Sequence, residues 1–221
     1  MLAVCGLGVV AHGCSSQMTI PRLRKLYDPN CTRCPLHANA KHVCVPSSGV
    51  KTAFKAMIVG EAPGRNEDEQ NRPFVGRSGW LLDRELYRCN VGRDNIVVTN
   101  AVKCRPTTGH GKFNLTPQEP DISTCVDAYL AHEIMVLDAR HILALGNVAA
   151  RVLLDTTTGV SMLRSSWHAL DSETERWVRV TYHPAYVLRN GLDSVIAREF
   201  RQDIETFIDR IKRRARDNRG S

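Results

Sequence analysis

Short apolar runs alternate with amphipathic stretches along most of the chain. Four runs predict buried strands, at residues 55–59, 95–99, 141–146 and 177–182. Apolar residues at helical spacing predict helices at about 79–88, 117–136, 148–154 and 196–211. A strand–helix series joined by right-handed crossovers predicts an α/β fold, with a mainly parallel sheet and helices on both of its faces.

The loop after the first strand is the most informative segment. Residues 60–64 read Gly-Glu-Ala-Pro-Gly and follow that strand directly. The residues that fall at predicted strand ends are Gly60, Asn100, Gly146 and His183. Open α/β sheets bind their ligands at the carboxyl ends of the strands, so we expect a binding site built from these loops.

The composition limits the class of protein. A chain of 221 residues with 43% hydrophobic content can form one sizeable core, and we expect a single, monomeric domain over residues 18–211. No apolar run reaches 18 residues, which argues against a membrane span or a membrane partner. The net charge of +7 and the isoelectric point near 9.1 favour a polyanionic partner, although many basic proteins bind no nucleic acid.

The two ends of the chain differ from the rest. Residues 1–17 hold no charged side chain, and the positive start of a secretory signal is missing. We interpret them as a disordered or non-native extension, with Met18 as an alternative start, and expect a cytoplasmic protein. Residues 212–221 are rich in arginine and are expected to form a solvated basic tail.

Eight cysteines give the second strong signal. Cys31 and Cys34 form a Cys-x-x-Cys pair, and two thiolates from a distant loop and helix could complete four soft ligands for an iron-sulfur cluster or zinc. Without a secretory signal, a disulfide framework is the weaker interpretation. Cys44 lies near enough to compete as a ligand, whereas Cys89 suits a packed thiol. Composition alone leaves the choice of four from eight open.

Four segments together resemble the iron-sulfur, or family 4, uracil-DNA glycosylases. They are residues 60–64, 72–77 (Arg-Pro-Phe-Val-Gly-Arg), 99–106 (Thr-Asn-Ala-Val-Lys-Cys-Arg-Pro) and 183–189 (His-Pro-Ala-Tyr-Val-Leu-Arg). The resemblance extends from about Tyr27 to Phe207. It implies a three-layer α/β sandwich with a central four-stranded sheet, a 4Fe-4S cluster, and hydrolysis of the N-glycosidic bond of deoxyuridine in single- or double-stranded DNA. The cluster ligands it implies are Cys31, Cys34, Cys104 and Cys125.

The residue types in these segments suit recognition of an extruded base. A base inside a duplex must be flipped into a pocket and read by stacking and by hydrogen bonds to its pairing edge. Phe74 offers a stacking face, and the Asn100 amide can accept from uracil N3–H and donate to O4, a pattern that cytosine opposes. Taken by themselves, Phe74 is better read as a core aromatic and Asn100 as a turn or cap residue; the other motifs favour base recognition instead.

The resemblance also places the loop over residues 60–67 against the substrate. Gly60 lets the backbone approach closely. Ala62 stands where better-known uracil glycosylases have a catalytic Asp. At the position of Gly64, a related class of glycosylases has a Tyr that excludes the methyl group of thymine. In this chain, Glu67 is a candidate for the side chain that excludes it.

Two residues are candidates for catalysis. His183 can donate a hydrogen bond to uracil O2, where negative charge develops as the bond breaks. Glu61 can orient the attacking water or stabilise the cationic sugar. A His before a Pro at a strand end could instead cap a turn.

The remaining basic and apolar residues of the motifs are candidates for DNA contacts. Leu188 is expected to fill the vacated base stack in the minor groove. Candidates for phosphate contacts are Arg65, Arg77, Lys103, Arg105 and Arg189.

The chain departs from the family pattern at two places. Gln70-Asn71 replaces the glycine usual before Arg-Pro-Phe-Val-Gly, and residues 107–115 lengthen the segment between the last two candidate ligands. His110 invites comparison with a sister family whose histidine captures the sugar covalently, but Asn114 stands at the matching position, so we favour hydrolysis and release.

Alternative functions are a glycosylase for another deaminated or modified base, and a non-catalytic or covalently trapping binder of uracil DNA. A ferredoxin-like carrier fits least, because its cysteines usually form a compact repeat.

Overall fold

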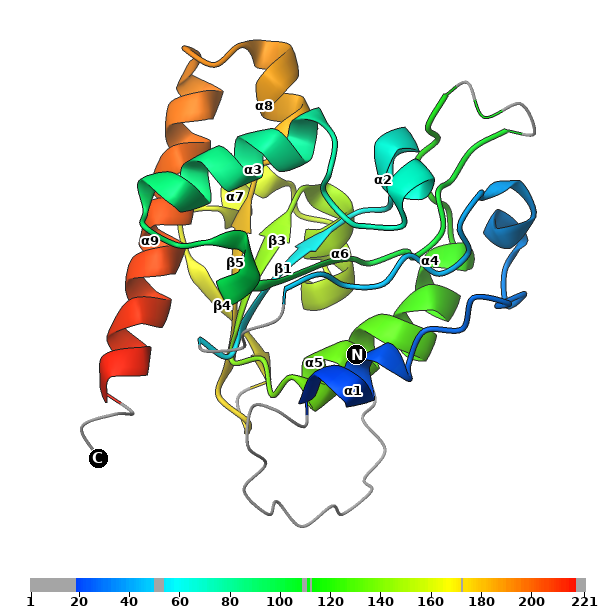
Figure 1. Ribbon diagram of the computed structural model, residues 1–221. Helices are drawn as coiled ribbons and strands as arrows, with labels where there is room; N and C mark the ends of the chain where they lie inside the picture. Colours follow the sequence, from blue (N-terminus) through cyan, green and yellow to red (C-terminus); the bar gives the residue numbers. More distant parts are fainter. Residues whose placement is uncertain (1–18, 50–53, 109–110, 112, 172, 218–221) are drawn as a thin grey trace.

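The computed structural model describes residues 19–49, 54–108, 111, 113–171 and 173–217 (Figure 1). The predicted extension over residues 1–17 and His110 lie outside the described residues. The helices are α1 (Thr19–Arg24), η2 (Pro35–Asn39), α2 (Arg65–Gln70), α3 (Arg77–Arg88), η3 (Arg93–Asn95), α4 (Asp121–Cys125), η4 (Val126–Leu130), α5 (Ala131–Val136), α6 (Asn147–Leu154), α7 (Val160–Leu163), α8 (Pro184–Asn190) and α9 (Val195–Asp217). The strands are β1 (Ala56–Gly60), β2 (Val97–Asn100), β3 (His141–Leu145), β4 (Trp167–Asp171) and β5 (Arg176–Thr181).

A mainly parallel sheet forms the centre of the molecule, in the order β2-β1-β3-β5-β4. The first four of these strands are parallel, and β4 pairs antiparallel with β5 at one edge. The α/β class is confirmed, but the expected count of four strands is wrong, because β4 makes a fifth. Its sequence, Trp-His-Ala-Leu-Asp, lacks the continuous apolar run that marks the strands buried on both faces.

Strand side chains alternate between two cores, one on each face of the sheet. In β1, Met57 and Val59 belong to one core and Ile58 to the other. The first core is covered by α4, α5 and α6, and the second by α3, α8 and α9. Figure 1 shows these two helical layers on opposite sides of the sheet. The expected sandwich arrangement follows from this alternation.

The long helix expected from Pro117 begins four residues later, at Asp121, and is not uniform. Residues 121–136 form α4, a π-helical turn η4, and α5. π-helical turns inside α-helices are rare and often accompany functional sites. Here the turn directly follows Cys125, one of the candidate ligands.

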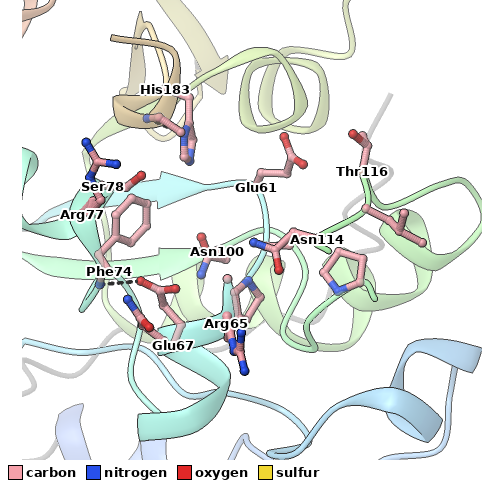
Figure 2. Close-up of a pocket in the computed structure, with 18 of the residues that line it drawn as sticks. Glu61, Arg65, Glu67, Phe74, Arg77, Ser78, Asn100, Asn114, Thr116 and His183 are labelled. Atoms are coloured by element: carbon pink, nitrogen blue, oxygen red, sulfur yellow. Dashed lines mark hydrogen bonds between the residues drawn. The ribbon is translucent and has the colours of Figure 1, made fainter. Parts of the chain in front are cut away.

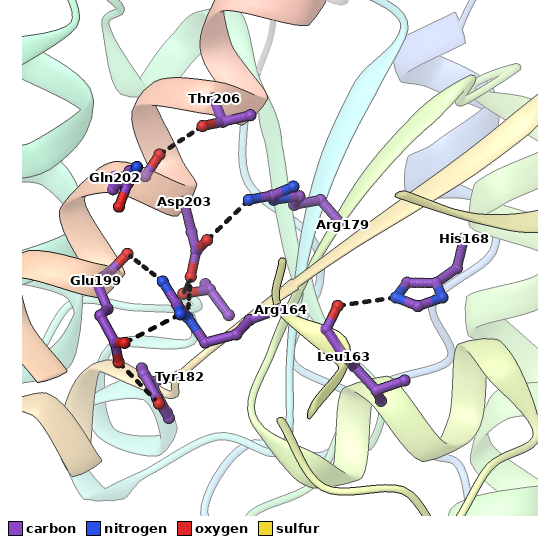
Figure 3. Close-up of polar contacts among 10 residues, drawn as sticks. Leu163, Arg164, His168, Arg179, Tyr182, Glu199, Gln202, Asp203 and Thr206 are labelled. Carbon is purple, nitrogen blue, oxygen red and sulfur yellow. Dashed lines mark hydrogen bonds and ion pairs between the residues drawn. The ribbon is translucent and has the colours of Figure 1, made fainter. Parts of the chain in front are cut away.

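A buried carboxylate fastens α9 to β5 and α7. Asp203 accepts hydrogen bonds from Arg164 Nε at 2.9 Å, Arg179 Nη2 at 2.9 Å and Thr181 Oγ1 at 2.8 Å (Figure 3). Three donors compensate the desolvation of this carboxylate. The network therefore fixes the end of β5, which leads directly to His183.

The basic segment after residue 211 is not separate from the domain as far as the structure describes it. Helix α9 continues to Asp217, and Lys212 donates a hydrogen bond from Nζ to the carbonyl oxygen of Cys89. Residues 212–217 are thus the last turns of α9, and Arg213, Arg214 and Arg216 among them are exposed, so a solvated basic segment stays a prediction. No helix in the described part of the chain is long and apolar enough to cross a membrane.

Candidate active site

A cavity of about 550 Å³ opens at the carboxyl edge of the sheet (Figure 2). Its walls come from the loop after β1, the start of α3, the end of β2, the segment before α4 and the start of α8. The lining residues are Glu61, Ala62, Pro63, Gly64, Arg65, Asn66, Glu67, Phe74, Gly76, Arg77, Ser78, Asn100, Pro106, Asn114, Leu115, Thr116, His183, Ala185 and Arg189. The predicted site at this edge is therefore a real cavity.

Gly60, Phe74 and Asn100 meet at the base of the cavity. A Cβ on Gly60 would lie 2.5 Å from Asn100 Oδ1 and 2.5 Å from Phe74 Cζ, so any larger residue there would displace one of them. Asn100 is 4% exposed, and its Oδ1 is buried without a hydrogen-bond partner. A buried acceptor left unpaired costs about 1–3 kcal/mol, which a ligand N–H would relieve.

Phe74 is held in a strained backbone conformation against the cavity. Its φ of 54° lies in the left-handed region, which a non-glycine residue rarely adopts. The backbone of Phe74 lies so close to Gly79 that a Cβ there would be 1.8 Å from the Phe74 carbonyl oxygen. Its ring lies 6.1 Å from the His183 ring, centroid to centroid. The two rings therefore flank the same space.

Glu67 braces the loop that carries Phe74. Its Oε1 accepts hydrogen bonds from the backbone N–H groups of Val75 and Gly76, both at 2.9 Å. Its Oε2 lies 2.7 Å from the place where Gly64 would carry a Cβ. Glu67 thus occupies the space beside Gly64 while fixing the Phe74 loop.

His183 has a defined protonation and tautomer. It is the N-cap of α8, and its Nδ1 accepts a hydrogen bond from the Ala185 N–H at 3.1 Å. Burial, and to a lesser extent the charge of Arg189, lowers the pKa of His183 to about 4. The imidazole is therefore neutral at pH 7 and carries its proton on Nε2, which is free to donate.

Gly146 gives His183 the room it needs. Its φ is +90°, and a Cβ there would lie 3.0 Å from the Cβ of His183. The Gly146 N–H also donates to the Thr181 carbonyl oxygen at 2.9 Å. The end of β3 and the end of β5 therefore position the histidine together.

Glu61 faces the cavity from the loop after β1. It is partly buried, and this burial raises the pKa of its carboxyl group. In Figure 2 it lies across from Phe74, with His183 and Asn100 between them. A carboxyl group with a raised pKa is suited to exchange a proton near neutral pH.

A second, small cavity gathers thiols. The predicted ligands Cys31, Cys34, Cys104 and Cys125 all line it, and Cys44 joins them. The backbone N–H of Cys44 donates to Cys104 Sγ at 3.4 Å. Hydrogen bonds to ligand sulfurs are one way in which proteins tune iron-sulfur clusters. Burial raises the pKa of the Cys104 and Cys125 thiols to about 12, an effect that bound iron would oppose.

The thiols in this cavity are a soft donor set of the kind that iron-sulfur clusters use. Within the described ranges, no group of three His, Cys, Asp or Glu side chains is placed to hold a single metal ion. In a cluster, each cysteine can bind a different iron, so the sulfurs surround a larger volume. The donor set therefore fits the cluster that the sequence implies.

Comparison with known proteins agrees with this geometry. The model of the uracil-DNA glycosylase superfamily matches residues 47–208. A type-4 uracil-DNA glycosylase of Pyrobaculum aerophilum is 36% identical over 193 residues, covering 84% of this chain and 93% of the relative. Type-4 enzymes of Thermotoga maritima and Archaeoglobus fulgidus are each 35% identical, covering 83% and 72% of this chain and 90% and 78% of their own lengths. The chain belongs to the type-4 uracil-DNA glycosylases.

Most residues predicted for DNA or base contact in this type-4 uracil-DNA glycosylase lie at the cavity. Arg65, Arg77 and Arg189 line it, as do Ala62 and Glu67. The three arginines are exposed at this cavity, and their contacts with phosphate stay a prediction.

Three other predicted contact residues lie elsewhere. Arg105 is 5% exposed and donates from Nε to Asn114 Oδ1 and from Nη2 to the Gly111 carbonyl oxygen, both at 2.7 Å. Leu188 is partly buried and packs against the second core. Lys103 is 1% exposed. Arg105 and Lys103 are buried and hydrogen-bonded within the chain, and their contacts with phosphate stay a prediction.

The longer segment of this type-4 enzyme supplies a wall that sequence reasoning missed. An antiparallel bridge pairs Thr107 with Asn114. Asn114, Leu115 and Thr116 line the cavity. The sequence showed only that this segment is longer than is usual in the family. Its length does not predict whether the segment lies against the cavity or extends into solvent.

Proposed function

We propose that this type-4 uracil-DNA glycosylase hydrolyses the N-glycosidic bond of deoxyuridine in single- or double-stranded DNA, releasing uracil and leaving an abasic site. The observation that carries the proposal is the buried Asn100 Oδ1 without a partner at the base of the cavity. Membership of the family supports it, because the relatives are named for this activity.

Base recognition would use Asn100 and Phe74. The Asn100 Oδ1 accepts from uracil N3–H and the Nδ2 donates to O4, while the Phe74 ring stacks on the flipped base. Cytosine presents an acceptor and a donor at those positions, so it would leave buried groups mismatched. Glu67 and Gly64 form the neighbouring wall, where the methyl group of thymine would be excluded.

Departure of uracil would depend on His183. As the bond between C1′ and N1 breaks, both bonding electrons leave with the uracil, and negative charge develops at O2. The neutral His183 donates from Nε2 to that oxygen, which stabilises the charge where it forms. A low pKa is an advantage, since the imidazole is a donor at neutral pH without the cost of burying a cation.

Glu61 would act on the water and on the sugar. Its carboxylate stabilises the positive character of the sugar ring and orients a water towards C1′. The water oxygen bonds to C1′, and its proton passes through Glu61 to the departing uracil or to solvent. Neither a cofactor nor a covalent intermediate takes part in this step.

The cluster, when bound, supplies a rigid link between distant parts of the chain. Cys31 and Cys34 lie near the start of the described domain, Cys104 follows β2, and Cys125 lies at the end of α4. These four would hold it and thereby brace the segment between Asn100 and Pro106. Arg65, Arg77 and Arg189 would contact DNA phosphates around the cavity.

The test is base release from end-labelled oligonucleotides that carry one uracil, single-stranded or opposite G or A, followed by alkali cleavage. Hypoxanthine and thymine substrates are controls. Release that depends on uracil, and that falls strongly in Asn100→Ala and His183→Ala, supports the proposal. Release only from hypoxanthine would keep the mechanism and overturn the substrate. Tight or covalent retention of uracil DNA without release would overturn hydrolysis.

A further inference from the structure

A buried ion pair that the proposed mechanism does not use lies just below the cavity. Lys103 and Glu133 are 1% and 0% exposed at their side chains, and Lys103 Nζ lies 2.7 Å from Glu133 Oε2. Burying such a pair contributes little to stability, because desolvation offsets the attraction. In some proteins, buried ionic groups instead select one arrangement of the residues around them.

The three hydrogens of the Lys103 ammonium have three close acceptors. They are Glu133 Oε2 at 2.7 Å, Thr99 Oγ1 at 2.6 Å and the carbonyl oxygen of Asn100 at 2.7 Å. The Tyr27 hydroxyl contacts the other carboxylate oxygen, Glu133 Oε1. The ammonium therefore has one orientation that satisfies all of its donors.

The contact with the Asn100 carbonyl oxygen matters for the cavity. Asn100 ends β2, and its side chain points to the site where the base would bind. After it, the Ala101 N–H donates to the Gly60 carbonyl oxygen at 2.9 Å and the Val102 N–H to that of Glu61 at 3.0 Å. Lys103 is thus the side chain that holds the peptide unit following Asn100, and rotation of that unit would redirect the amide.

The same lysine also touches the cysteine cavity. Its backbone N–H donates to Cys125 Sγ at 3.2 Å, and Lys103 is one of the residues that line that cavity. Tyr27, the partner of Glu133, stacks on Tyr129 with the ring centroids 6.4 Å apart, and Tyr129 lines the cavity too. Lys103 and its partners therefore lie between the thiols and Asn100.

We propose that Lys103 and Glu133 are positioning residues. They hold the Asn100 side-chain amide in the orientation that hydrogen-bonds to the base, and they connect Asn100 to the cysteine cavity. The inference rests on the proposed function, since it concerns recognition of uracil by the same site. It predicts that the pair affects the binding of uracil much more than the breaking of the bond.

The experiment compares the full-length wild-type protein with Lys103→Met/Glu133→Leu, which removes both charges and leaves neither unpaired. The control is Lys55→Met, which breaks an exposed ion pair of the same length, 2.7 Å, to Asp138. The readouts are binding of free uracil, KM and kcat for a uracil oligonucleotide, thermal melting, and visible absorbance per chain from the cluster.

In the double variant, we expect the dissociation constant of free uracil and KM to rise about tenfold, with kcat within about threefold of wild type. Melting and absorbance per chain should stay near the wild-type values, and the control should leave all readouts unchanged. Unchanged uracil binding in a folded double variant would overturn the proposal. Loss of absorbance together with binding would also overturn it, because the pair would then act by maintaining the cysteine cavity.

A second variant tests the proposal if the double variant does not fold. Thr99→Val keeps the shape of the side chain and removes the hydroxyl that lies between Lys103 and Glu133. We expect uracil binding to weaken about threefold, and an unchanged constant would overturn the proposal. A wild-type protein that neither binds nor releases uracil would overturn the proposed function as well, whereas normal wild-type activity with unaffected variants would overturn only the positioning role.

Discussion

At the scale of single residues, the candidate site depends on the absence of side chains as much as on their presence. Gly60 leaves the space in which Asn100 and Phe74 meet, and Gly146 leaves the space for His183. The sequence indicated Gly60 because a glycine follows a strand at the edge that binds ligands. It did not indicate which side chains fill the vacant space, since Asn100 comes from β2 and Phe74 from the loop before α3.

Gly60→Ala tests this packing. The added methyl would lie 2.5 Å from both Asn100 Oδ1 and Phe74 Cζ, so we expect the rate of uracil release to fall by about 10- to 100-fold, corresponding to about 1–3 kcal/mol of displaced recognition groups. The measurement is kcat/KM on a uracil oligonucleotide. Gly159→Ala is the matched control, because a Cβ there meets nothing within 4 Å. Equal activity of both variants would contradict the assigned base of the cavity.

The titration of Glu61 and His183 sets the expected pH dependence. Glu61 has a raised pKa and must be ionised to act, so activity should fall as pH decreases through that value. His183 is already neutral above about pH 4 and should add no inflection near its ordinary pKa of 6.5. Profiles of kcat/KM against pH test both points. Glu61→Gln should lower activity and remove the acidic limb; an inflection near 6.5 that survives in this variant would contradict the assignment of a neutral histidine.

At the scale of elements, periodicity identified the four parallel strands and the longer helices, α3, α6, α9 and the segment from α4 to α5, whereas the short helices α1, α2, α7 and α8 were not predicted. The sequence missed β4 because an edge strand is buried on only part of its surface and lacks a continuous apolar run. It also missed that Asn114, which is paired with Thr107 by a bridge, lines the cavity. Both features depend on pairing between segments that are separate in the sequence. The hydrophobic pattern of a single segment does not record such pairing.

The carboxylate that joins α9 to β5 makes an element-scale prediction. Asp203→Leu would leave Arg164 and Arg179 without their shared partner, and removing one member of a buried charged group costs about 3–5 kcal/mol. We expect the free energy of unfolding in urea to fall by about that amount. Asp209→Ala, at an exposed position of the same helix, is the control. A loss below about 1 kcal/mol would mean that the network does not hold the two elements together.

At the scale of the whole molecule, two histidines with lowered pKa values, the buried His141 and the partly buried His183, should make folding sensitive to acid. The pKa of His141 is about 4 because of burial and the nearby charges of Arg210, Arg214 and Arg140, and that of His183 is also about 4. Both values lie below the ordinary 6.5, so the unfolded state binds more protons and stability is lost as pH falls from 6.5 towards 4. From pH 7.5 to 5.5, each should cost about 1 kcal/mol.

Urea denaturation at these two pH values measures the effect. The loss should be about halved in His141→Gln, whose glutamine does not titrate. The same loss in wild type and variant would assign the pH dependence to other groups.

Iron removal by a chelator, followed at constant pH, should also lower stability if the four cysteines hold a cluster, because binding to the folded state alone stabilises it.

The sequence by itself determined the class of fold, the edge of the sheet that carries the site, and the family. Buried strands and tight turns require particular residue types at neighbouring positions, so they can be recognised from apolar runs, glycines and motifs. Tertiary structure alone decided which groups meet. It brought four separated cysteines and Cys44 to one cavity, and it buried Arg105 and Lys103, which in sequence resemble surface cations. A charged residue carries no local mark of its partner, and only the packing of distant elements decides whether its charge faces water or another side chain.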